Sequence, residues 1–352
     1  MSFILAEAYL HNLDPFAIEF PASWTALKFV PEGIRWYGLS YIAGFVLAWL
    51  LFRWMAKTKR STLPSRDAVT DLMFYIIIGV LVGGRLGYVF FYKPSLIWDP
   101  PLVGLIQVWD GGMASHGGMI GVALACIIFA KRRGISALHL CDLAVFAAPF
   151  GLSLGRLANF VNGELPGKVL PASMQSYPVS SPLIDPPWWG IKYPDEIFSW
   201  INLPDERLIQ VDQLRSIVTD DKHFYQNVVT ALKEGNAQVV NAIEPLLTTY
   251  YPSQLIQALT DGPILILALV LVWLKPRKPG VVGGWFLMIY GLLRIFSEIF
   301  REPDAGVALL FNAISRGQLL SIFMIILGAI IAVLCQRRDV QRLGGLLRPG
   351  NN

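Results

Sequence analysis

Charged residues are scarce in this sequence. Only 15% of its 352 residues are Asp, Glu, Lys or Arg, whereas a soluble domain carries about a quarter. Hydrophobic residues make up 54%, and the mean hydropathy is +0.51. A soluble core cannot bury so much apolar surface, so the composition indicates an integral membrane protein and argues against a soluble enzyme.

Cysteine is also scarce, and common metal-binding patterns are lacking. The three cysteines, Cys126, Cys141 and Cys335, lie in apolar segments without CxxC spacing. Neither a disulfide framework nor a zinc site is therefore expected, and the cysteines are interpreted as packing residues. The sequence has no H-E-x-x-H pattern and no carboxylate-rich set. We therefore predict no metal and no cofactor.

Long apolar segments dominate what is present. At a rise of about 1.5 Å per residue, each is long enough to cross about 30 Å of hydrocarbon. They lie at 34–56, 67–92, 112–130, 136–154, 254–274, 280–300 and 318–336. The predicted fold class is all-α: a polytopic integral membrane protein with about seven transmembrane helices and an extracytoplasmic arm insert.

Short basic clusters follow the odd-numbered segments. Their members are Lys57, Lys59, Arg60 and Arg66; Lys131, Arg132 and Arg133; Lys275, Arg277 and Lys278; and Arg337, Arg338 and Arg342. Because cytoplasmic loops are enriched in Lys and Arg, the N-terminus is predicted outside and the C-terminus in the cytoplasm. The clusters do not form one patch, so nucleic acid is not expected as a partner despite a net charge of +4.

The spans and connecting segments predict five parts of the chain. They are an outer interfacial N-terminal segment (1–33), spans 1–4 with the site motif (34–168), the extracytoplasmic arm (169–253), spans 5–7 (254–336) and a cytoplasmic tail (337–352). The arm is too long for a hairpin and has ordinary charge density. We expect a small ordered insert with helices near 208–218 and 223–248.

Ionisable residues within the spans are the first candidates for function, because each costs roughly a few kcal/mol to place in a membrane. They are Arg85, His116, Asp142, Arg294 and Glu298. Structural alternatives exist for each. Arg294 and Glu298 are four residues apart and could form a salt bridge within one helix. His116 could be an interhelical hydrogen-bonding residue, Arg85 could snorkel or bridge helices, and Asp142 is interpreted as structural.

The most distinctive polar run is Gly155 to Gly167, at the end of the fourth span. It contains Arg156, Asn159, Asn162 and Glu164 among three glycines. A plain helix end needs only a cap, whereas arginine provides a planar fork for phosphate and glycines let a ligand approach the backbone. With His116 as a group able to move a proton, these residues predict metal-free group transfer on a phospholipid.

Several stretches match one bacterial enzyme family in order and spacing. They lie at 34–38, 83–88, 111–118, 155–167, 251–255, 290–294 and 301–304. The sequence therefore resembles the prolipoprotein diacylglyceryl transferases over nearly its whole length. This resemblance implies seven spans with an outer N-terminus and a location in the bacterial cytoplasmic (inner) membrane.

The resemblance also implies a reaction. The sn-1,2-diacylglyceryl group moves from phosphatidylglycerol to the thiol of a lipobox cysteine, which releases glycerol phosphate and begins lipoprotein maturation. The implied partners are phosphatidylglycerol, membrane lipids and the lipobox signal peptides of preprolipoproteins.

Site residues follow from the same resemblance. Arg156 resembles the family's phosphatidylglycerol-binding arginine, Arg294 its second essential arginine, and His116 the histidine proposed as base for the thiol. Positions around the family's cavity correspond to Tyr37, Asn159, Glu164, Gly167 and Glu298, and our charge analysis adds Arg85 and Asn162 as substrate-binding candidates. One departure is Tyr251, where the family usually has histidine, so a histidine there cannot be required in this protein.

Two other functions remain open from the sequence. A lipid transporter would also bury arginines, but internal repeats and broken helices in matching halves would be expected, and none was found. A non-catalytic lipid-binding scaffold would account for the arginines, but it would not account as well for His116 and the polar run.

Overall fold

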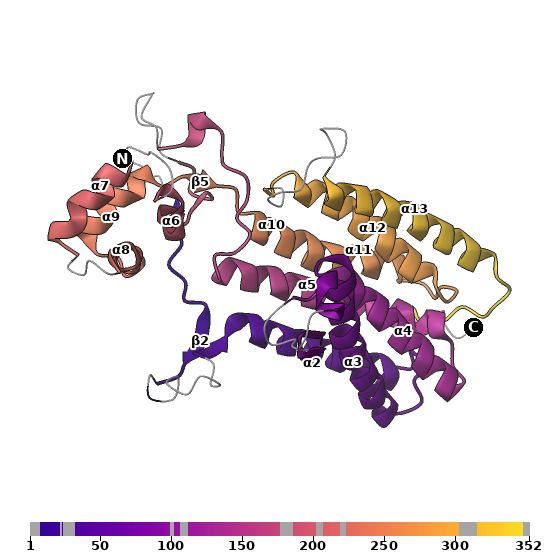
Figure 1. Ribbon diagram of the computed structural model, residues 1–352. Coiled ribbons are helices and arrows are strands. Elements are labelled where there is room, and N and C mark those ends of the chain that lie inside the picture. Colours follow the sequence, from indigo (N-terminus) through magenta and orange to yellow (C-terminus); the bar gives the residue numbers. More distant parts are fainter. Residues whose placement is uncertain are drawn as a thin grey trace. The chain divides into compact units, whose positions relative to one another are not determined.

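The computed structural model describes residues 8–21, 23, 32–98, 102–105, 112–176, 186–201, 207–218, 223–302 and 315–347. The chain forms two compact units (Figure 1). The first unit comprises Met1–Leu39, Gly155–Ala258 and Phe296–Arg316, and the second comprises Ser40–Leu154, Leu259–Ile295 and Gly317–Asn352.

Long helices form most of the second unit and continue into the first. They are α2 (Trp36–Lys57), α3 (Arg66–Phe91), α4 (Ser115–Arg133), α5 (Ala137–Val161), α10 (Ser253–Leu259), α11 (Leu265–Val272), α12 (Val281–Glu298) and α13 (Arg316–Arg337). The π-helical turn η8 (Thr260–Ile264), which contains Pro263, joins α10 to α11. Between α3 and α4 lie the short 3₁₀ helices η1 (Pro94–Ile97) and η2 (Leu102–Leu105).

Six helical segments in the described part of the chain are long and apolar enough to cross a membrane. They are α2, α3, α5, the continuous segment Ser253–Val272, α12 and Gly317–Arg337. The prediction of a mostly helical, polytopic membrane protein is therefore confirmed. The expected span at 112–130 corresponds to α4, which is outside this set of six. Its 19 residues include Lys131, Arg132 and Arg133, so its uninterrupted apolar stretch is short.

Large apolar side chains from several helices fill the core of the second unit. Phe52 of α2, Leu72 of α3, Phe129 of α4 and Leu140 of α5 are fully or almost fully buried. Trp273, directly after α11, packs against the ring of Phe146 with their centroids 4.9 Å apart. Side chains of this size exclude solvent and fix the depth of each helix relative to its neighbours.

Two small β-sheets in the first unit were not expected from the sequence. One sheet has the strand order β1 (Tyr9–Leu10), β4 (Ile191–Lys192), β5 (Thr249–Tyr250), with β1 parallel and β5 antiparallel to β4. The other pairs β2 (Phe16–Glu19) with β3 (Gly33–Arg35). Strands of two to four residues are too short to show a reliable alternating pattern, which is why the sequence alone did not predict them.

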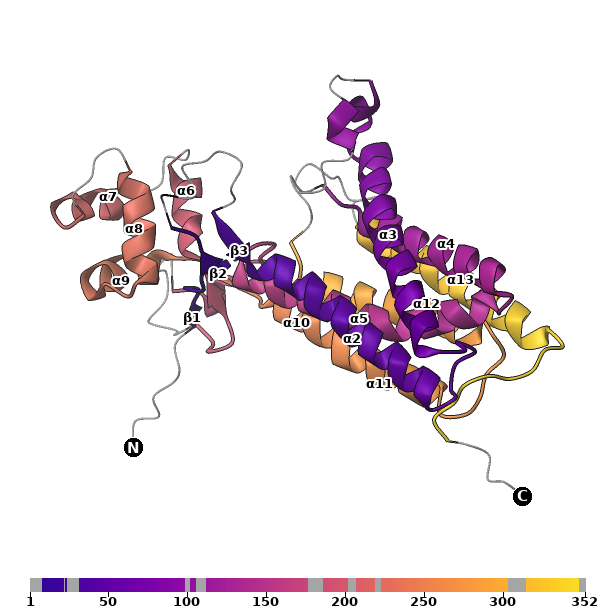
Figure 2. The same cartoon turned by 90° about the horizontal axis from the view of Figure 1, so that it is seen from below.

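Short helices with their own apolar core occupy much of the expected arm. They are η4 (Ala172–Met174), η5 (Pro194–Glu196), α6 (Ile197–Trp200), α7 (Arg207–Asp212), η6 (Gln213–Ser216), α8 (Phe224–Lys233), α9 (Ala237–Ile243) and η7 (Glu244–Leu246). Gly235, at a φ of +78°, ends the predicted helix at 223–248 between α8 and α9. Trp200, Val228 and Ile243 are fully buried in the core, around which α7, α8 and α9 gather (Figure 2).

Candidate active site

The polar run Gly155–Gly167, called the polar turn below, belongs to the first unit and begins on the last turns of α5. The amide of Asn162 donates to the carbonyl of Ala158 at 2.9 Å, and that of Glu164 donates to Asn159 at 2.9 Å. Gly163 has a φ of +67°, which lets the chain reverse after the helix. The local sequence therefore produces a tight, hydrogen-bonded helix end.

This turn carries side chains of different chemistry close together. Arg156 is half-buried on α5, three residues before the buried Asn159, so the two lie on one helix face. The side-chain amide of Asn162 donates to Glu164 Oε1 at 3.3 Å, and Glu164 is otherwise exposed. A guanidinium, two amides and a carboxylate suit a ligand that has both a phosphate and hydroxyl groups.

Gly167 is required by close backbone packing at the end of the turn. It forms a β-bridge with Arg301, and the next amide, of Lys168, donates to the carbonyl of Phe300 at 2.9 Å. A Cβ atom at Gly167 would lie only 2.9 Å from the Phe300 oxygen and would collide with the carbonyl of Tyr251. Any larger residue would therefore push the turn away from both neighbours.

Two buried side chains that the sequence analysis did not single out contact the carbonyls of this turn. His11 Nε2 donates to the Phe160 oxygen at 2.7 Å, and Gln254 Nε2 donates to the Glu164 oxygen at 2.8 Å. Gln254 lies in a stretch that matched the family, and His11 is one of four histidines in the chain. Because histidine is scarce in this apolar sequence, His11 could have been singled out from the sequence. Its hydrogen-bond partner, Phe160, is too distant in the chain to be recognised in that way.

Glu298 and Tyr37, two further predicted residues, also belong to the first unit. Glu298 ends α12, is 9% exposed, and accepts a hydrogen bond from Ser315 Oγ at 3.3 Å. Its carboxylate lies 4.0 Å from the guanidinium of Arg301. Tyr37 is the second residue of α2 and is half-buried.

His116 and Arg294 belong to the second unit. His116 is exposed in the first turn of α4, and Arg294 is half-buried near the end of α12. The charge of Arg294 interacts electrostatically with the His116 imidazole. The two predicted catalytic residues, far apart in the sequence, therefore lie within electrostatic range of each other in one unit.

Arg85 binds the loop between α3 and α4. Its guanidinium donates to the carbonyls of Leu105 at 3.3 Å and Gly112 at 3.1 Å, and also to that of Gly104. The side chain is only 6% exposed and lies over the ring of Tyr88. These contacts favour the bridging alternative for Arg85, since backbone oxygens already engage all three of its nitrogen atoms.

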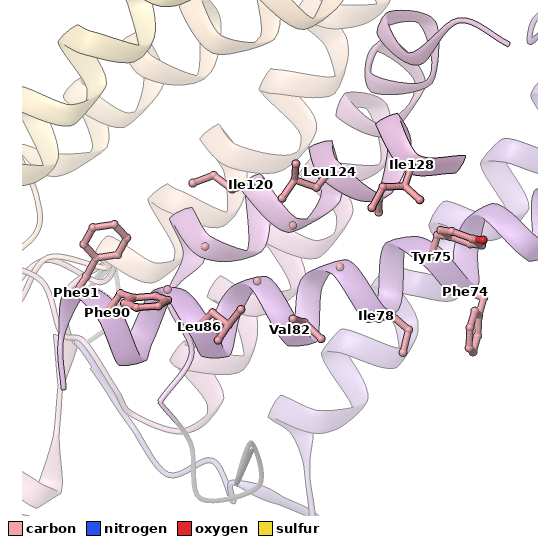
Figure 3. Close-up of a pocket in the computed structure, with 16 residues that line it drawn as sticks. Phe74, Tyr75, Ile78, Val82, Leu86, Phe90, Phe91, Ile120, Leu124 and Ile128 are labelled. Carbon is pink, nitrogen blue, oxygen red and sulfur yellow. The ribbon is translucent and has the colours of Figure 1, made fainter. Parts of the chain in front are cut away.

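A mainly apolar groove of about 580 Å³ runs along the paired helices α3 and α4. Figure 3 shows Ile78, Val82 and Leu86 on one helix facing the same groove as Ile120 and Leu124 on the other. Its lining also includes the glycines Gly79, Gly83, Gly87, Gly117 and Gly121. The helices touch through these glycines, and a Cβ at Gly87 would lie 2.8 Å from Gly117 Cα.

Asp142 caps the start of α12 from the neighbouring helix α5. Its Oδ2 accepts from the Gly280 amide and its Oδ1 from the Gly283 amide, both at 2.7 Å. These two hydrogen bonds satisfy amides that a helix N-terminus leaves without an internal partner. They support the interpretation of Asp142 as structural.

Two of the three thiols, and a serine that fits a nucleophile pattern, have settings that do not suit a nucleophile. Cys126, Cys141 and Cys335 are free thiols, and Cys126 and Cys335 are buried. The letters Gly151-Leu152-Ser153-Leu154-Gly155 fit G-x-S-x-G, yet the whole run lies inside α5. A serine nucleophile of that type needs a sharp strand-to-helix turn, so Ser153 is not in such an elbow.

Tyr251, the departure from the family pattern, occupies an aromatic setting. Its ring stacks on Trp189 at 5.7 Å and meets Phe300 edge-on at 5.4 Å. Its amide donates to the carbonyl of Lys168 at 2.9 Å. The residue therefore packs beside the polar turn through its ring and backbone.

These features define a polytopic membrane protein with arginines, a histidine and a polar helix end in or beside its spans. The chain belongs to the prolipoprotein diacylglyceryl transferase family, whose sequence profile matches residues 25–334. The resemblance inferred from the motifs is thereby confirmed.

Individual relatives support the same assignment. The chain is 36% identical to the phosphatidylglycerol–prolipoprotein diacylglyceryl transferase of Bdellovibrio bacteriovorus, over 96% of this chain and 97% of the relative. Identity to the enzyme of the same name from Geobacter sulfurreducens is 38%, over 87% and 92%. Identity to the enzyme of that name from Salmonella arizonae is 38%, over 96% of this chain and 99% of the relative.

Proposed function

We propose that this protein transfers the sn-1,2-diacylglyceryl group from phosphatidylglycerol to the lipobox cysteine of prolipoproteins, the first step of bacterial lipoprotein maturation. The observation that carries the proposal is the family match across residues 25–334, which contains every predicted site residue. Relatives of that name align over nearly their full length, so the whole catalytic unit has a counterpart in this chain.

The reaction places negative charge on phosphate. The bond between glycerol C3 and the phosphate oxygen breaks, a bond between C3 and the cysteine sulfur forms, and glycerol phosphate leaves. In this proposal the Arg156 guanidinium binds the phosphate, because a guanidinium in a water-poor site stabilises such charge far better than it does in water. Arg294 keeps the role that the family resemblance implies, that of a second essential arginine. Arginine also offers a planar, bidentate fork that lysine lacks.

His116 is the proposed acceptor of the thiol proton. The thiolate attacks C3, because the thiol itself is a poor nucleophile. The two residues His116 and Arg294 belong to the same unit of the fold, within electrostatic range of each other. The proton moves from sulfur to the imidazole while the electron pair of the broken C–O bond stays on the phosphate, so the step needs no redox partner.

The remaining predicted residues are proposed to shape the headgroup site. Asn159, Asn162 and Glu164 offer hydrogen-bonding groups for glycerol hydroxyls, and Gly167 keeps the backbone close. Tyr37 and Glu298 complete the substrate-binding set. Arg85 stays a substrate-binding candidate in this proposal, and its three backbone contacts add a role in ordering the α3–α4 loop.

The groove between α3 and α4 is the proposed route for the lipid's acyl chains. Apart from Tyr75, whose hydroxyl accepts a hydrogen bond from Arg132, its lining consists of apolar side chains and glycines, so an acyl chain would leave no polar group unpaired there. The same glycine faces were expected from the sequence to admit lipid sideways between helices.

We further propose seven spans, with α4 as the third, in the bacterial inner membrane. The N-terminus lies outside, the C-terminus lies in the cytoplasm, and the segment 169–253 is an extracytoplasmic arm that helps to position the lipobox signal peptide. Contacts in the second unit support this topology. Arg60, after α2, donates to the carbonyls of Gly345 and Leu346 at 3.1 Å each. Lys278, after α11, donates to the carbonyl of Arg338, so basic clusters that follow different spans meet.

A direct assay tests the proposed activity. Purified protein is mixed with phosphatidylglycerol and a lipobox peptide, and the mass of the peptide is followed. We expect a diacylglyceryl adduct on the peptide's cysteine and none on the matched peptide with serine in its place. Movement of lipid between leaflets without an adduct would indicate a transporter, and binding alone would indicate a scaffold.

A further inference from the structure

Two strands of the three-stranded sheet in the first unit, β1 and β5, lead to side chains that contact the polar turn. Strand β1 is followed directly by His11, whose amide donates to the Lys192 carbonyl at 2.9 Å. Strand β5 is followed by Tyr251 and then by Ser253 and Gln254 at the start of α10. The sheet therefore brings two distant parts of the chain to the same helix end.

His11 is held in one orientation by aromatic neighbours. The residue is 2% exposed, and its ring centroid lies 5.3 Å from that of Tyr193 and 5.5 Å from that of Phe160. A carbonyl oxygen can only accept, so Nε2 carries the hydrogen that reaches the Phe160 oxygen. Nδ1 is buried without a partner among the described residues, which suits a neutral ring with its proton on Nε2.

Gln254 acts on the other end of the turn. It is 1% exposed, and its Nε2 donates to the Glu164 carbonyl at 2.8 Å while the amide group also hydrogen-bonds with the Tyr193 hydroxyl. Next to it, Ser253 Oγ donates to the carbonyl of Leu165 at 3.3 Å. Leu165 has a φ of +54°, an unfavourable conformation for a residue with a bulky side chain, so outside contacts are needed to hold it.

The two side chains bind carbonyls on either side of Asn162 and Gly163. The turn's own hydrogen bonds link residues within it, whereas His11 and Gln254 join it to the segments that follow β1 and β5. An exposed helix end with these internal bonds alone would be free to fray. Its amides and the Arg156 guanidinium would then lose their common orientation.

We propose that His11 and Gln254 are positioning residues for diacylglyceryl transfer, which hold the polar turn in the shape that binds the phosphatidylglycerol headgroup. This inference rests on the proposed function of the turn. Neither side chain touches substrate. Their loss is expected to weaken use of phosphatidylglycerol specifically, since the lipobox peptide does not depend on that turn in this proposal.

The test compares His11→Leu, Gln254→Leu and His11→Gln with the parental protein. Leucine keeps an apolar volume but cannot donate, whereas glutamine places an N–H close to the position of the imidazole Nε2. Tyr9→Phe is the matched control, because it lies on the same strand, keeps its ring against Phe160 and loses only a hydrogen bond to Asn12. Initial rates are measured against each substrate separately, together with thermal stability and amide exchange at Asn162, Gly163 and Glu164.

We expect both leucine variants to raise the KM for phosphatidylglycerol roughly three- to tenfold, the effect of losing the one buried hydrogen bond that each side chain makes to the polar turn, with the peptide KM unchanged. Exchange at the three amides should rise by a similar factor, and His11→Gln and Tyr9→Phe should stay near parental values. Unchanged phosphatidylglycerol KM in both leucine variants would overturn the inference. Equal changes in both KM values, or losses of rate that only follow melting temperature and are not rescued in His11→Gln, would reduce both residues to general stability and also overturn it.

A parental protein without any transfer would overturn the proposed function instead. The exchange measurement distinguishes this case, because it reports on the turn without turnover. Parental-like protection in both leucine variants would refute the positioning role whether or not the protein is active.

Discussion

At the scale of single residues, chemical type matters more than charge at the proposed phosphate site. Arg156 is half-buried on α5 beside Asn159, where a side chain has little freedom to choose its geometry. A guanidinium can bind two phosphate oxygens from a fixed plane, whereas an ammonium offers one compact charge.

We therefore expect Arg156→Lys to lose most transfer activity while the protein still inserts and accumulates. An interaction made mainly in the transition state is worth about 2.7–4 kcal/mol at comparable sites, or a factor of roughly 10² to 10³ in rate. Single-turnover assays with phosphatidylglycerol measure this loss. Arg132→Lys, on the last turn of α4, is the control for replacing an arginine with lysine. Parental rates for Arg156→Lys would reduce Arg156 to a positive charge or a structural anchor.

The proposed base and the structural carboxylate should respond differently to amide substitution. His116→Gln keeps a hydrogen-bonding group but cannot take up a proton, so transfer should slow by about 10² to 10⁴ with little loss of stability. In Asp142→Asn, one side-chain acceptor at the start of α12 becomes a donor facing an amide, which should cost about 1–3 kcal/mol of stability. Rates and thermal melts of both variants are compared. If activity simply followed stability in both, His116 would have no separate catalytic role.

His11 gives the contacts of the polar turn a pH dependence. Burial lowers the pKa of His11 below its ordinary value of 6.5, and Lys233 lowers it further, against the opposing effects of the Phe160 carbonyl and Asp195. As pH falls below about 6.5, the unfolded segment takes up a proton that the folded one does not, so folding stability decreases.

Protection of the Asn162, Gly163 and Glu164 amides should therefore fall between about pH 7 and pH 5, after correction for the intrinsic exchange rate. His11→Gln has no titrating group at this position and should show a flatter profile. A parental profile as flat as that of His11→Gln would contradict the effect.

At the scale of elements, the pairing of α3 with α4 depends on glycine. Their backbones touch at Gly83 and Gly117, and this contact fixes the start of α4, where His116 follows Ser115. Small residues at such positions allow close packing of membrane helices. The same helices form the walls of the apolar groove, so the spacing between them sets its width (Figure 3).

Neighbouring glycines on α4 provide a matched pair of variants. A methyl group at Gly117 would collide with the carbonyl of Gly83 and lie 2.9 Å from Gly87 Cα, whereas one at Gly118 would meet only the Val80 oxygen at 4.0 Å. We expect Gly117→Ala to lose about 1–3 kcal/mol of stability and much of its activity, and Gly118→Ala to remain near parental. Thermal melts in detergent and transfer rates measure both. Equal tolerance of the two substitutions would argue against tight α3–α4 packing.

At the scale of the whole molecule, basic residues that follow α2 and α11 contact the segment after α13 in the second unit. Arg277 forms a β-bridge with Leu343, and Arg60 binds the following residues Gly345 and Leu346. Lys57, Lys131 to Arg133, and Arg337 occupy the last turns of α2, α4 and α13, while α3, α5 and α12 end without a basic residue. A membrane with a cytoplasmic preference for positive charge would orient the unit by this asymmetry.

Reporter fusions test this orientation. Fusions after residues 62, 133, 277 and 340 should all report cytoplasm, because each follows an odd-numbered span in the proposed topology. A fusion at 230, within α8, should report the opposite side. A cytoplasmic signal at 230 would contradict the seven-span arrangement and the extracytoplasmic arm together.

The sequence itself determined the apolar segments, the positions of the basic clusters and the existence of the polar turn. Apolar length, charge next to a span and a helix end rich in glycine and amides are local properties, so neighbouring residues are enough to recognise them. The division of the predicted 223–248 helix at Gly235 shows the limit of this reasoning, since one glycine can either be tolerated in a helix or end it.

Only the tertiary structure decided which side chains support the candidate site. The hydrogen bonds of His11 to Phe160, Asp142 to Gly280 and Gln254 to Glu164 join residues 149, 138 and 90 positions apart. Donors and acceptors at such separations leave no periodic trace in the sequence, because each partner alone resembles an ordinary polar residue. Arg85 illustrates the same point, since its contacts with the loop carbonyls could not be recognised from the sequence.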